Sequence, residues 1–223
     1  MTFKALIFDM DGTLLDNMHV HNTIWSEYLA EHGVHLTPTE IGIRTASLPN
    51  PQIIRMFLGE GLEPDLVWAK ATEKEDRYRD RLARGLIEPL PGLRAFLDEI
   101  AAAGLPRAVA SSASRVNLDF TLKALQLETF FQAVISSEDV LHGKPHPEPF
   151  LKAAERLGQA PGDCLVFEDS SFGLQAAQNA GMRAVALTTS HPAEELRHFP
   201  HLIGLMPDYQ AVSLAGVLEG RIG

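Results

Sequence analysis

From residue 89 onward, short apolar segments alternate with amphipathic segments, and this alternation limits the folds open to the chain. The predicted strands cover 107–110, 133–135, 163–167 and 184–187, and the predicted helices cover 93–103, 116–125, 147–157 and 173–180. Strands and helices alternating at these lengths are typical of a parallel sheet with helices on both faces. The apolar run at 5–8 adds a further buried strand near the start. We therefore expect an α/β fold with a doubly wound parallel sheet.

Polar side chains follow four of these predicted strands, either directly after the strand or, for Lys144, in the loop that comes after it. They are Asp9, Asp11, Ser111, Lys144, Glu168 and Asp169. Each type has an ordinary explanation, because serine caps helices, lysine lies on surfaces and acidic pairs favour helix starts. Ligands of open parallel sheets, however, bind outside the carboxyl ends of the strands. The shared position of these side chains therefore predicts a single site.

Asp9 and Asp11 are the most informative of these residues. They follow a buried strand directly, one residue apart, and Gly12 can turn the chain sharply after them. Two carboxylates at the end of a buried strand repel each other unless a cation lies between them. The pattern therefore indicates a nucleophile and an acid/base that share a Mg²⁺ site, although a strand followed by an acidic turn would look the same.

Composition narrows the classes of partner and compartment. The net charge is −10, the chain has no block of Lys and Arg, and no apolar run approaches the roughly 20 residues that span a bilayer. Nucleic acid and anionic membranes are thus poor candidate partners. We expect no secretory leader, and the single cysteine, Cys164, fits a reducing cytoplasm. Cys164 lies in an apolar stretch, which favours a packed thiol over a nucleophile.

Residues 16–88 differ in character from the rest and predict an all-helical insert. Apolar and aromatic residues recur at helical spacing from 21 to 29, and Thr37 with Glu40 fits a capping box. A charged segment at 65–84 predicts a helix with solvated outer faces. We therefore expect a catalytic core made of 1–15 and 89–223, with a helical domain at 16–88.

Four motifs in this order resemble those of the haloacid dehalogenase superfamily of phosphohydrolases and phosphomutases. They are Phe8-Asp9-Met10-Asp11-Gly12-Thr13, the hydroxyl of Ser111, Gly143-Lys144-Pro145-His146-Pro147, and the segment 167–173 that begins Phe-Glu-Asp-Ser. The insert resembles the cap domain of the beta-phosphoglucomutase-like branch, which closes over the site. Asp16, His21 and Trp25 match that branch, and the segment 166–182 is similar to its sugar-phosphate phosphatases.

The resemblance implies a division of roles among the acids. Asp9 would attack phosphorus and also ligate Mg²⁺, while Asp11 would offer its backbone carbonyl to the metal and its carboxyl group as the acid/base. Asp169 would complete the metal site, and Glu168 would bind the metal directly or through water.

The remaining implied contacts concern the phosphoryl group and the substrate. Ser111, Lys144 and the backbone N–H groups of Gly12 and Ser112 would bind the phosphoryl oxygens. Lys144 would also keep Asp9 ionised. Two residues of the insert have open interpretations. His21 either contacts Asp11 or the substrate, or packs between helices. Arg44 either holds a substrate anion or is an ordinary surface arginine.

We therefore expect a Mg²⁺-dependent phosphatase acting on a small phosphorylated metabolite such as a sugar phosphate, present as a monomer or weak dimer. The alternative is a phosphomutase of the beta-phosphoglucomutase kind, which uses the same phosphoenzyme. Thr13 and the segment 41–45 favour hydrolysis. A haloacid dehalogenase is disfavoured, because the members of the family with that activity need no Mg²⁺ and lack a second acid like Asp11. A non-catalytic binding module is disfavoured because every catalytic position of the motifs is filled.

Overall fold

The computed structural model describes residues 3–45, 48–85, 87–220 and 222. The chain divides into two compact units, Met1–Asp16 with Glu88–Gly223 and, inserted between them, Asn17–Ile87. We call them the α/β unit and the helical unit. The sequence predicts a division at 15/16 and 88/89, so each observed division lies one residue away from the expected position.

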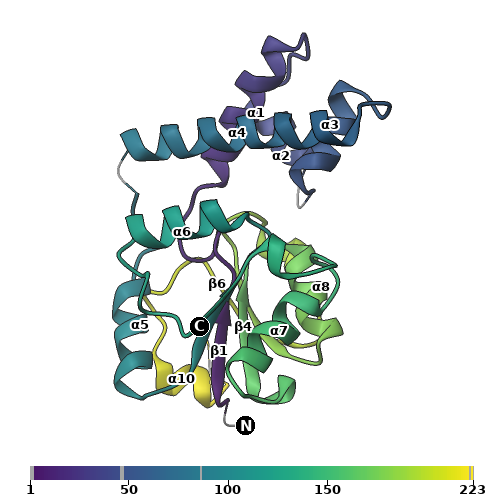
Figure 1. Cartoon of the computed structure of the whole chain (residues 1–223). Coiled ribbons are helices and arrows are strands. Elements are labelled where there is room, and N and C mark those ends of the chain that lie inside the picture. Colours follow the sequence, from purple (N-terminus) through teal and green to yellow (C-terminus); the bar gives the residue numbers. More distant parts are fainter. Residues whose placement is uncertain (1–2, 46–47, 86, 221, 223) are drawn as a thin grey trace. The chain divides into compact units, whose positions relative to one another are not determined.

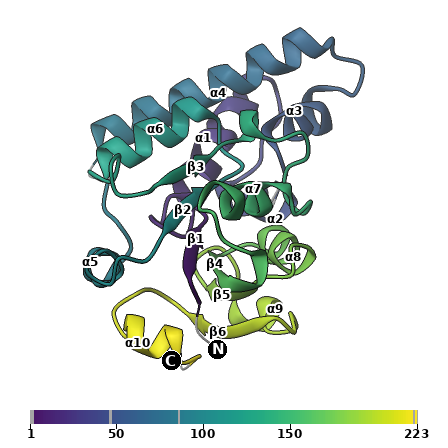
Figure 2. The same ribbon diagram turned by 60° about the horizontal axis from the view of Figure 1, so that its bottom comes forward.

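The α/β unit is built on a six-stranded sheet whose neighbouring strands all run parallel (Figures 1 and 2). The strands are β1 (Ala5–Phe8), β2 (Arg107–Ala110), β3 (Ala133–Ile135), β4 (Cys164–Glu168), β5 (Arg183–Leu187) and β6 (Leu202–Met206). Their order in the sheet is β3-β2-β1-β4-β5-β6. The predicted doubly wound parallel sheet is confirmed, with β6 as a strand that the sequence analysis did not identify.

Both faces of the sheet are buried at its centre, since successive strand residues point to opposite sides and every residue of β1 and β4 is buried. On one face, Ile7 belongs to an apolar cluster with Phe150 and Leu174. On the other face, Phe8 stacks on Phe167 with ring centroids 4.7 Å apart. The flanking helices are α5 (Leu93–Ala102), α6 (Arg115–Ala124), α7 (Glu148–Arg156), α8 (Ser171–Asn179), α9 (Ala193–Leu196) and α10 (Leu214–Leu218), with 3₁₀ turns η1 (Ser137–Asp139) and η2 (Pro161–Asp163). Figure 2 shows α5 on one side of the sheet and α7 and α8 on the other.

The position of β1 determines where a ligand can bind. The chain leaves β1 for β2 and β3 on one side, then returns to β4, β5 and β6 on the other. Open α/β sheets bind ligands at this switch, outside the carboxyl ends of the strands. Asp9 follows β1, and β4 ends in Glu168 with Asp169 next, so all three carboxylates lie at the switch.

The described residues of the helical unit form α1 (Met18–Glu31), α2 (Pro38–Thr45), α3 (Asn50–Leu58) and α4 (Pro64–Arg84). The predicted capping box at the start of α2 is present: Glu40 N–H donates to Thr37 Oγ1 at 3.2 Å, and Thr37 N–H donates to Glu40 Oε2 at 2.8 Å. The helix predicted at 65–84 is present as α4, and two of its charged residues lie away from its solvated faces. Lys74 and Glu75 are buried, and they form an ion pair at 2.7 Å inside the unit. Over the part of the chain that the structure describes, no helix is long and apolar enough to cross a membrane.

Candidate active site

Lys144 joins the two strand ends that the motifs predict to meet. Its ammonium donates to Asp9 Oδ1 at 2.6 Å and to Glu168 Oε1 at 2.7 Å, and its side chain is only 4% exposed. The amine also lies over the ring of Phe150, 4.8 Å from the centroid. Asp9 and Glu168 are themselves buried. A single ammonium therefore neutralises part of a buried acidic cluster at the ends of β1 and β4.

Glu168 is held on both of its carboxylate oxygens. Oε1 accepts from Lys144, while Oε2 accepts from the N–H groups of Asp169 and Ser170 at 2.7 Å and from Ser170 Oγ at 2.9 Å. Gly173 makes room for this carboxylate, because a Cβ atom there would lie 1.7 Å from Oε1. Ser170 also caps α8 by accepting from Gly173 N–H at 3.0 Å. The segment from Glu168 to Gly173 is thus a cradle around one carboxylate, and Glu168 is well placed to orient Lys144.

Asp169 approaches the turn that follows β1. A Cβ atom at Gly12 would lie 1.9 Å from Asp169 Oδ2, and Gly12 adopts a φ of +76°, so glycine is required there on two counts. The turn is closed by the N–H groups of Thr13 and Leu14, which donate to Met10 O at 3.1 and 2.8 Å. The first and last motifs therefore meet in space although they lie far apart in sequence.

The backbone N–H of Gly12 is expected to bind a phosphoryl oxygen, and the structure shows a different partner. It donates to Leu15 O at 2.8 Å, because the turn folds back on itself and Asp11 bridges to Leu15. The role of Gly12 in the structure is therefore the close approach to Asp169. Asp11 is half-buried beside it.

The carboxylates of Asp9, Glu168 and Asp169 fit a hard cation. One oxygen of each lies within 4.8 Å of the others, and all three residues are buried. Oxygen ligands of this kind suit Mg²⁺. Burial, followed by repulsion from Glu168 and Asp9, raises the pKa of Asp169 well above its ordinary value. Three buried carboxylates thus share one lysine, and a bound divalent cation would favour their ionised forms.

Lys144 lowers the pKa of Asp9, in the direction expected, but a larger effect opposes it. Burial raises the pKa of Asp9 to about 8, because desolvation outweighs the lowering by Lys144 and adds to the repulsion from Glu168 and Asp11. Burial alone would lower the pKa of Lys144, but the carboxylates of Asp9 and Glu168 favour the ammonium form and raise it. The lysine stays charged, but Asp9 needs a second cation to be fully ionised at neutral pH.

Ser111 and Ser112 lie at the end of β2. Phe8 of β1 pairs with Val109 of β2, so Ser111 lies just beyond the level of Asp9. Ser111 is buried and its Oγ accepts from Ala113 N–H at 3.1 Å, while Ser112 is exposed. The register places both residues one strand away from Asp9, as predicted, and leaves their contacts to a phosphoryl group as a prediction.

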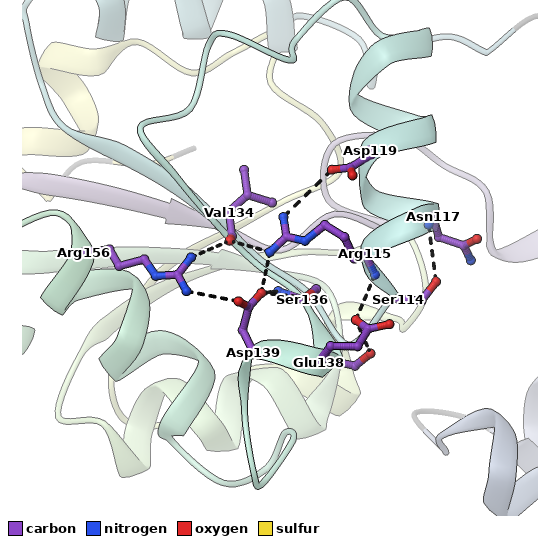
Figure 3. Close-up of polar contacts among 10 residues, drawn as sticks. Ser114, Arg115, Asn117, Asp119, Val134, Ser136, Glu138, Asp139 and Arg156 are labelled. Atoms are coloured by element: carbon purple, nitrogen blue, oxygen red, sulfur yellow. Dashed lines mark hydrogen bonds and ion pairs between the residues drawn. The ribbon is translucent and has the colours of Figure 1, made fainter. Parts of the chain in front are cut away.

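A cluster of charged residues ties the Ser111 loop to the loop that leads to Lys144 (Figure 3). Asp139 accepts from Arg115, from Arg156 at 3.0 Å, and from Ser136 Oγ at 2.7 Å. Both arginines also donate to the carbonyl of Val134. Figure 3 shows the two guanidinium groups converging on this carbonyl and on Asp139. The segments after β2 and β3 are thus held together by these contacts.

The two predicted residues of the helical unit differ in their surroundings. His21 Nδ1 lies 2.7 Å from Lys74 Nζ, and its ring stacks on Tyr78 at 3.8 Å. These contacts match the packing interpretation of His21 and leave a contact with substrate as a prediction. Arg44 is exposed on α2.

Two residues at the site were missed from the sequence, and both follow β5. Thr189 Oγ1 donates to Gly12 O at 2.5 Å, and Ser190 Oγ donates to Asp169 Oδ2. The signal was present, since the hydroxyl residues 188–190 follow the predicted strand 184–187 just as the other site residues follow theirs.

Comparison with known proteins identifies relatives over almost the whole chain. A fructose-1-phosphate phosphatase of Escherichia coli, YqaB, is 36% identical over 186 residues, covering 82% of this chain and 95% of the relative. The protein CbbY of Rhodobacter capsulatus is 33% identical over 227 residues, covering 98% of this chain and 99% of the relative. The crystal structure of CbbY from Rhodobacter sphaeroides with xylulose-(1,5)bisphosphate superposes with a TM-score of 0.80 at 25% identity, covering 96% of this chain and 98% of that one.

The family model described as haloacid dehalogenase-like hydrolase matches residues 6–187. This range begins inside β1 and ends with β5, and so includes all four motifs and the helical unit. The chain therefore belongs to the haloacid dehalogenase-like hydrolase family, as its motifs predict.

Proposed function

We propose that the protein is a Mg²⁺-dependent phosphatase that hydrolyses a small phosphorylated metabolite, such as a sugar phosphate, through a phosphorylated aspartate. The observation that carries this proposal is the buried cluster of Asp9, Glu168 and Asp169 around Lys144 at the switch point of the sheet. A phosphate ester is anionic, so a carboxylate can attack it only where positive charge is concentrated. Lys144 supplies one such charge, and the carboxylates can hold a cation that supplies another.

Asp9 is the proposed nucleophile. One of its carboxylate oxygens forms a bond to phosphorus while the bond from phosphorus to the ester oxygen breaks, and Asp11 donates a proton to that leaving oxygen. Water then attacks the phosphorus of the phosphorylated aspartate, Asp11 takes a proton from the water, and inorganic phosphate leaves as Asp9 is regenerated. Each acid thus returns to its starting state at the end of the cycle.

Asp9 and Asp169, with the backbone carbonyl of Asp11, are the proposed ligands of Mg²⁺. When bound, Mg²⁺ would supply positive charge that neutralises the phosphoryl oxygens. The two carboxylate oxygens of Glu168 accept four hydrogen bonds between them. This supports a role in orienting Lys144 over direct ligation of the metal. Lys144 and Ser111 would bind phosphoryl oxygens, with the N–H of Ser112 as a further donor.

The helical unit is proposed to be a cap that selects the substrate, with His21 and Arg44 as candidate contacts. This assignment rests on the resemblance of the insert to caps of the beta-phosphoglucomutase-like branch. A cytoplasmic location is proposed on the single, buried Cys164, which fits a reducing compartment. A monomer or weak dimer remains the expected state.

A phosphate-release screen over sugar phosphates, nucleotides and phosphoglycolate tests the proposal, with Mg²⁺ present or removed by chelation. We expect release with at least one sugar phosphate, dependence on Mg²⁺, and loss of release in Asp9→Asn. A coupled assay for isomer formation from beta-glucose 1-phosphate runs in parallel. Isomer formation without phosphate release would establish the phosphomutase alternative, and no turnover of any phosphate ester would contradict the enzyme assignment.

A further inference from the structure

The loop after β5 contacts both halves of the proposed metal site. Ser190 Oγ donates to Asp169 Oδ2, and Thr189 Oγ1 donates to the carbonyl of Gly12 at 2.5 Å. Ser190 Oγ also lies 2.8 Å from the position of a Cβ atom on Gly12. Two adjacent hydroxyl side chains therefore connect the turn after β1 with the acid after β4.

These contacts limit how the two chain segments can move. A carboxylate with one oxygen held by a hydroxyl donor presents its other oxygen in a defined direction. Asp169 is only 4% exposed, so few water molecules can replace the hydroxyl of Ser190. The bond from Thr189 similarly holds the carbonyl of Gly12 in the turn, one peptide after the Asp11 carbonyl that is the proposed backbone ligand. Hydrogen-bond partners of metal ligands typically contribute 10–100-fold to metal affinity.

We propose that Thr189 and Ser190 are positioning residues of the Mg²⁺ site, Ser190 by orienting the Asp169 carboxylate and Thr189 by holding the Asp11–Gly12 turn. This inference rests on the proposed function, since it assigns the role of these hydroxyls within the same site. It adds a fifth strand end, that of β5, to the four that carry the motifs.

The test measures metal binding directly. Isothermal titration of the full chain with Mg²⁺ gives a dissociation constant for the wild type, Ser190→Ala, Ser190→Thr and Thr189→Val. We expect Ser190→Ala to weaken Mg²⁺ binding about 10- to 100-fold, Thr189→Val to weaken it by a smaller factor, and Ser190→Thr to restore most of the affinity. In turnover assays, Ser190→Ala should raise the Mg²⁺ concentration needed for half-maximal activity more than it lowers kcat at saturating Mg²⁺.

Thr188→Val is the matched control. Thr188 belongs to the same loop, but its hydroxyl lies 3.5 Å from Met206 O on β6 and so faces the neighbouring strand. We expect its Mg²⁺ affinity to match the wild type. Should Ser190→Ala fail to fold, Ser190→Cys keeps the shape of the side chain with a weaker donor and should show the same weakening.

The outcomes separate this inference from the proposed function. Unchanged Mg²⁺ affinity in folded Ser190→Ala, in a protein whose wild type binds Mg²⁺ and releases phosphate, would overturn the inference alone. Equal weakening in Thr188→Val would also overturn it, because the effect would then belong to the loop in general. Weakened Mg²⁺ binding in a protein that turns over no phosphate ester would support the inference and contradict the proposed function.

Discussion

Helix propensity alone predicts that Gly173→Ala stabilises the protein, whereas the structure predicts that it destabilises it. Gly173 lies inside α8, where alanine is ordinarily more stable than glycine by about 1 kcal/mol. Its Cβ atom, however, would lie 1.7 Å from Glu168 Oε1, 1.9 Å from Cδ and 2.6 Å from Oε2. The carboxylate group must therefore move, and it is the group that receives hydrogen bonds from Lys144, Ser170 and Asp169 N–H.

The cost follows from those hydrogen bonds. Each bond to a charged group contributes about 1.5–3 kcal/mol, and displacement of Glu168 should break about two of them. After the gain in helix propensity of about 1 kcal/mol, we expect a loss of about 2–5 kcal/mol in the free energy of unfolding. For a chain of this size the unfolding midpoint should fall by roughly 4–20 °C. Phosphatase activity should fall by about 10²-fold as Lys144 loses its fixed partner.

Urea unfolding and thermal unfolding of Gly173→Ala measure this effect, with Gly162→Ala as the control. A Cβ atom at Gly162 meets no atom within 4 Å, so that variant should stay within about 0.5 kcal/mol of the wild type. If Gly173→Ala were as stable and as active as the wild type, the Glu168 carboxylate would not need the space that Gly173 leaves for it.

Three further predictions concern charge. Lys144→Met leaves Asp9 and Glu168 without their shared ammonium, so the free energy of unfolding should fall by about 3–5 kcal/mol without metal and by less with Mg²⁺; equal losses in urea unfolding under both conditions would contradict this. Burial raises the pKa of Asp9 to about 8, so Mg²⁺ must displace a proton below that pH. Calorimetry should therefore show proton release and an affinity that falls, by up to about tenfold per unit, from about pH 8 to about pH 6; a pH-independent affinity would argue against it. Burial alone would raise the pKa of Asp139, but Ser136 and the arginines Arg156 and Arg115 hold it well below its usual range. The ionised Asp139 therefore stabilises the folded protein at neutral pH, and this contribution fades as the pH falls below about 4. Asp139→Asn should cost about 1–2 kcal/mol at neutral pH and less near pH 3, by urea unfolding at both; an equal cost at the two pH values would contradict the ion pairs.

The strands that the sequence predicts correctly share a simple signature. β1, β2, β3, β4 and β5 are short runs of apolar residues bounded by turns, because both faces of a parallel sheet are buried. β6 was missed although Leu202–Met206 is also a short apolar run. Four of its five residues are only half-buried at the edge of the sheet, and Gly204 interrupts the run, where a Cβ atom would meet the side chain of Ile222. The glycine within the run is the one feature of its sequence that weakens a strand assignment.

The sequence likewise predicts only part of the site. The carboxylates and Lys144 are predictable because each follows a strand end, and the sheet then brings them together. The sequence does not show how deeply Asp9 is buried. It therefore does not predict that desolvation raises the pKa of Asp9 more than Lys144 lowers it. Lys74 is a second case. Its segment carries charges on every side, and only the packed unit shows that this ammonium lies over Trp25 and Tyr78.

The central claim is that Asp9 carries the phosphoryl group between substrate and water. Acid quenching during turnover, followed by borohydride reduction and mass spectrometry of the peptide around Asp9, tests it directly. We predict that Asp9 is recovered as the reduced product of an aspartyl phosphate only when substrate and Mg²⁺ are both present, and that Asp9→Asn gives neither modification nor phosphate release. Modification of another residue, or phosphate release by Asp9→Asn at the wild-type rate, would contradict the claim.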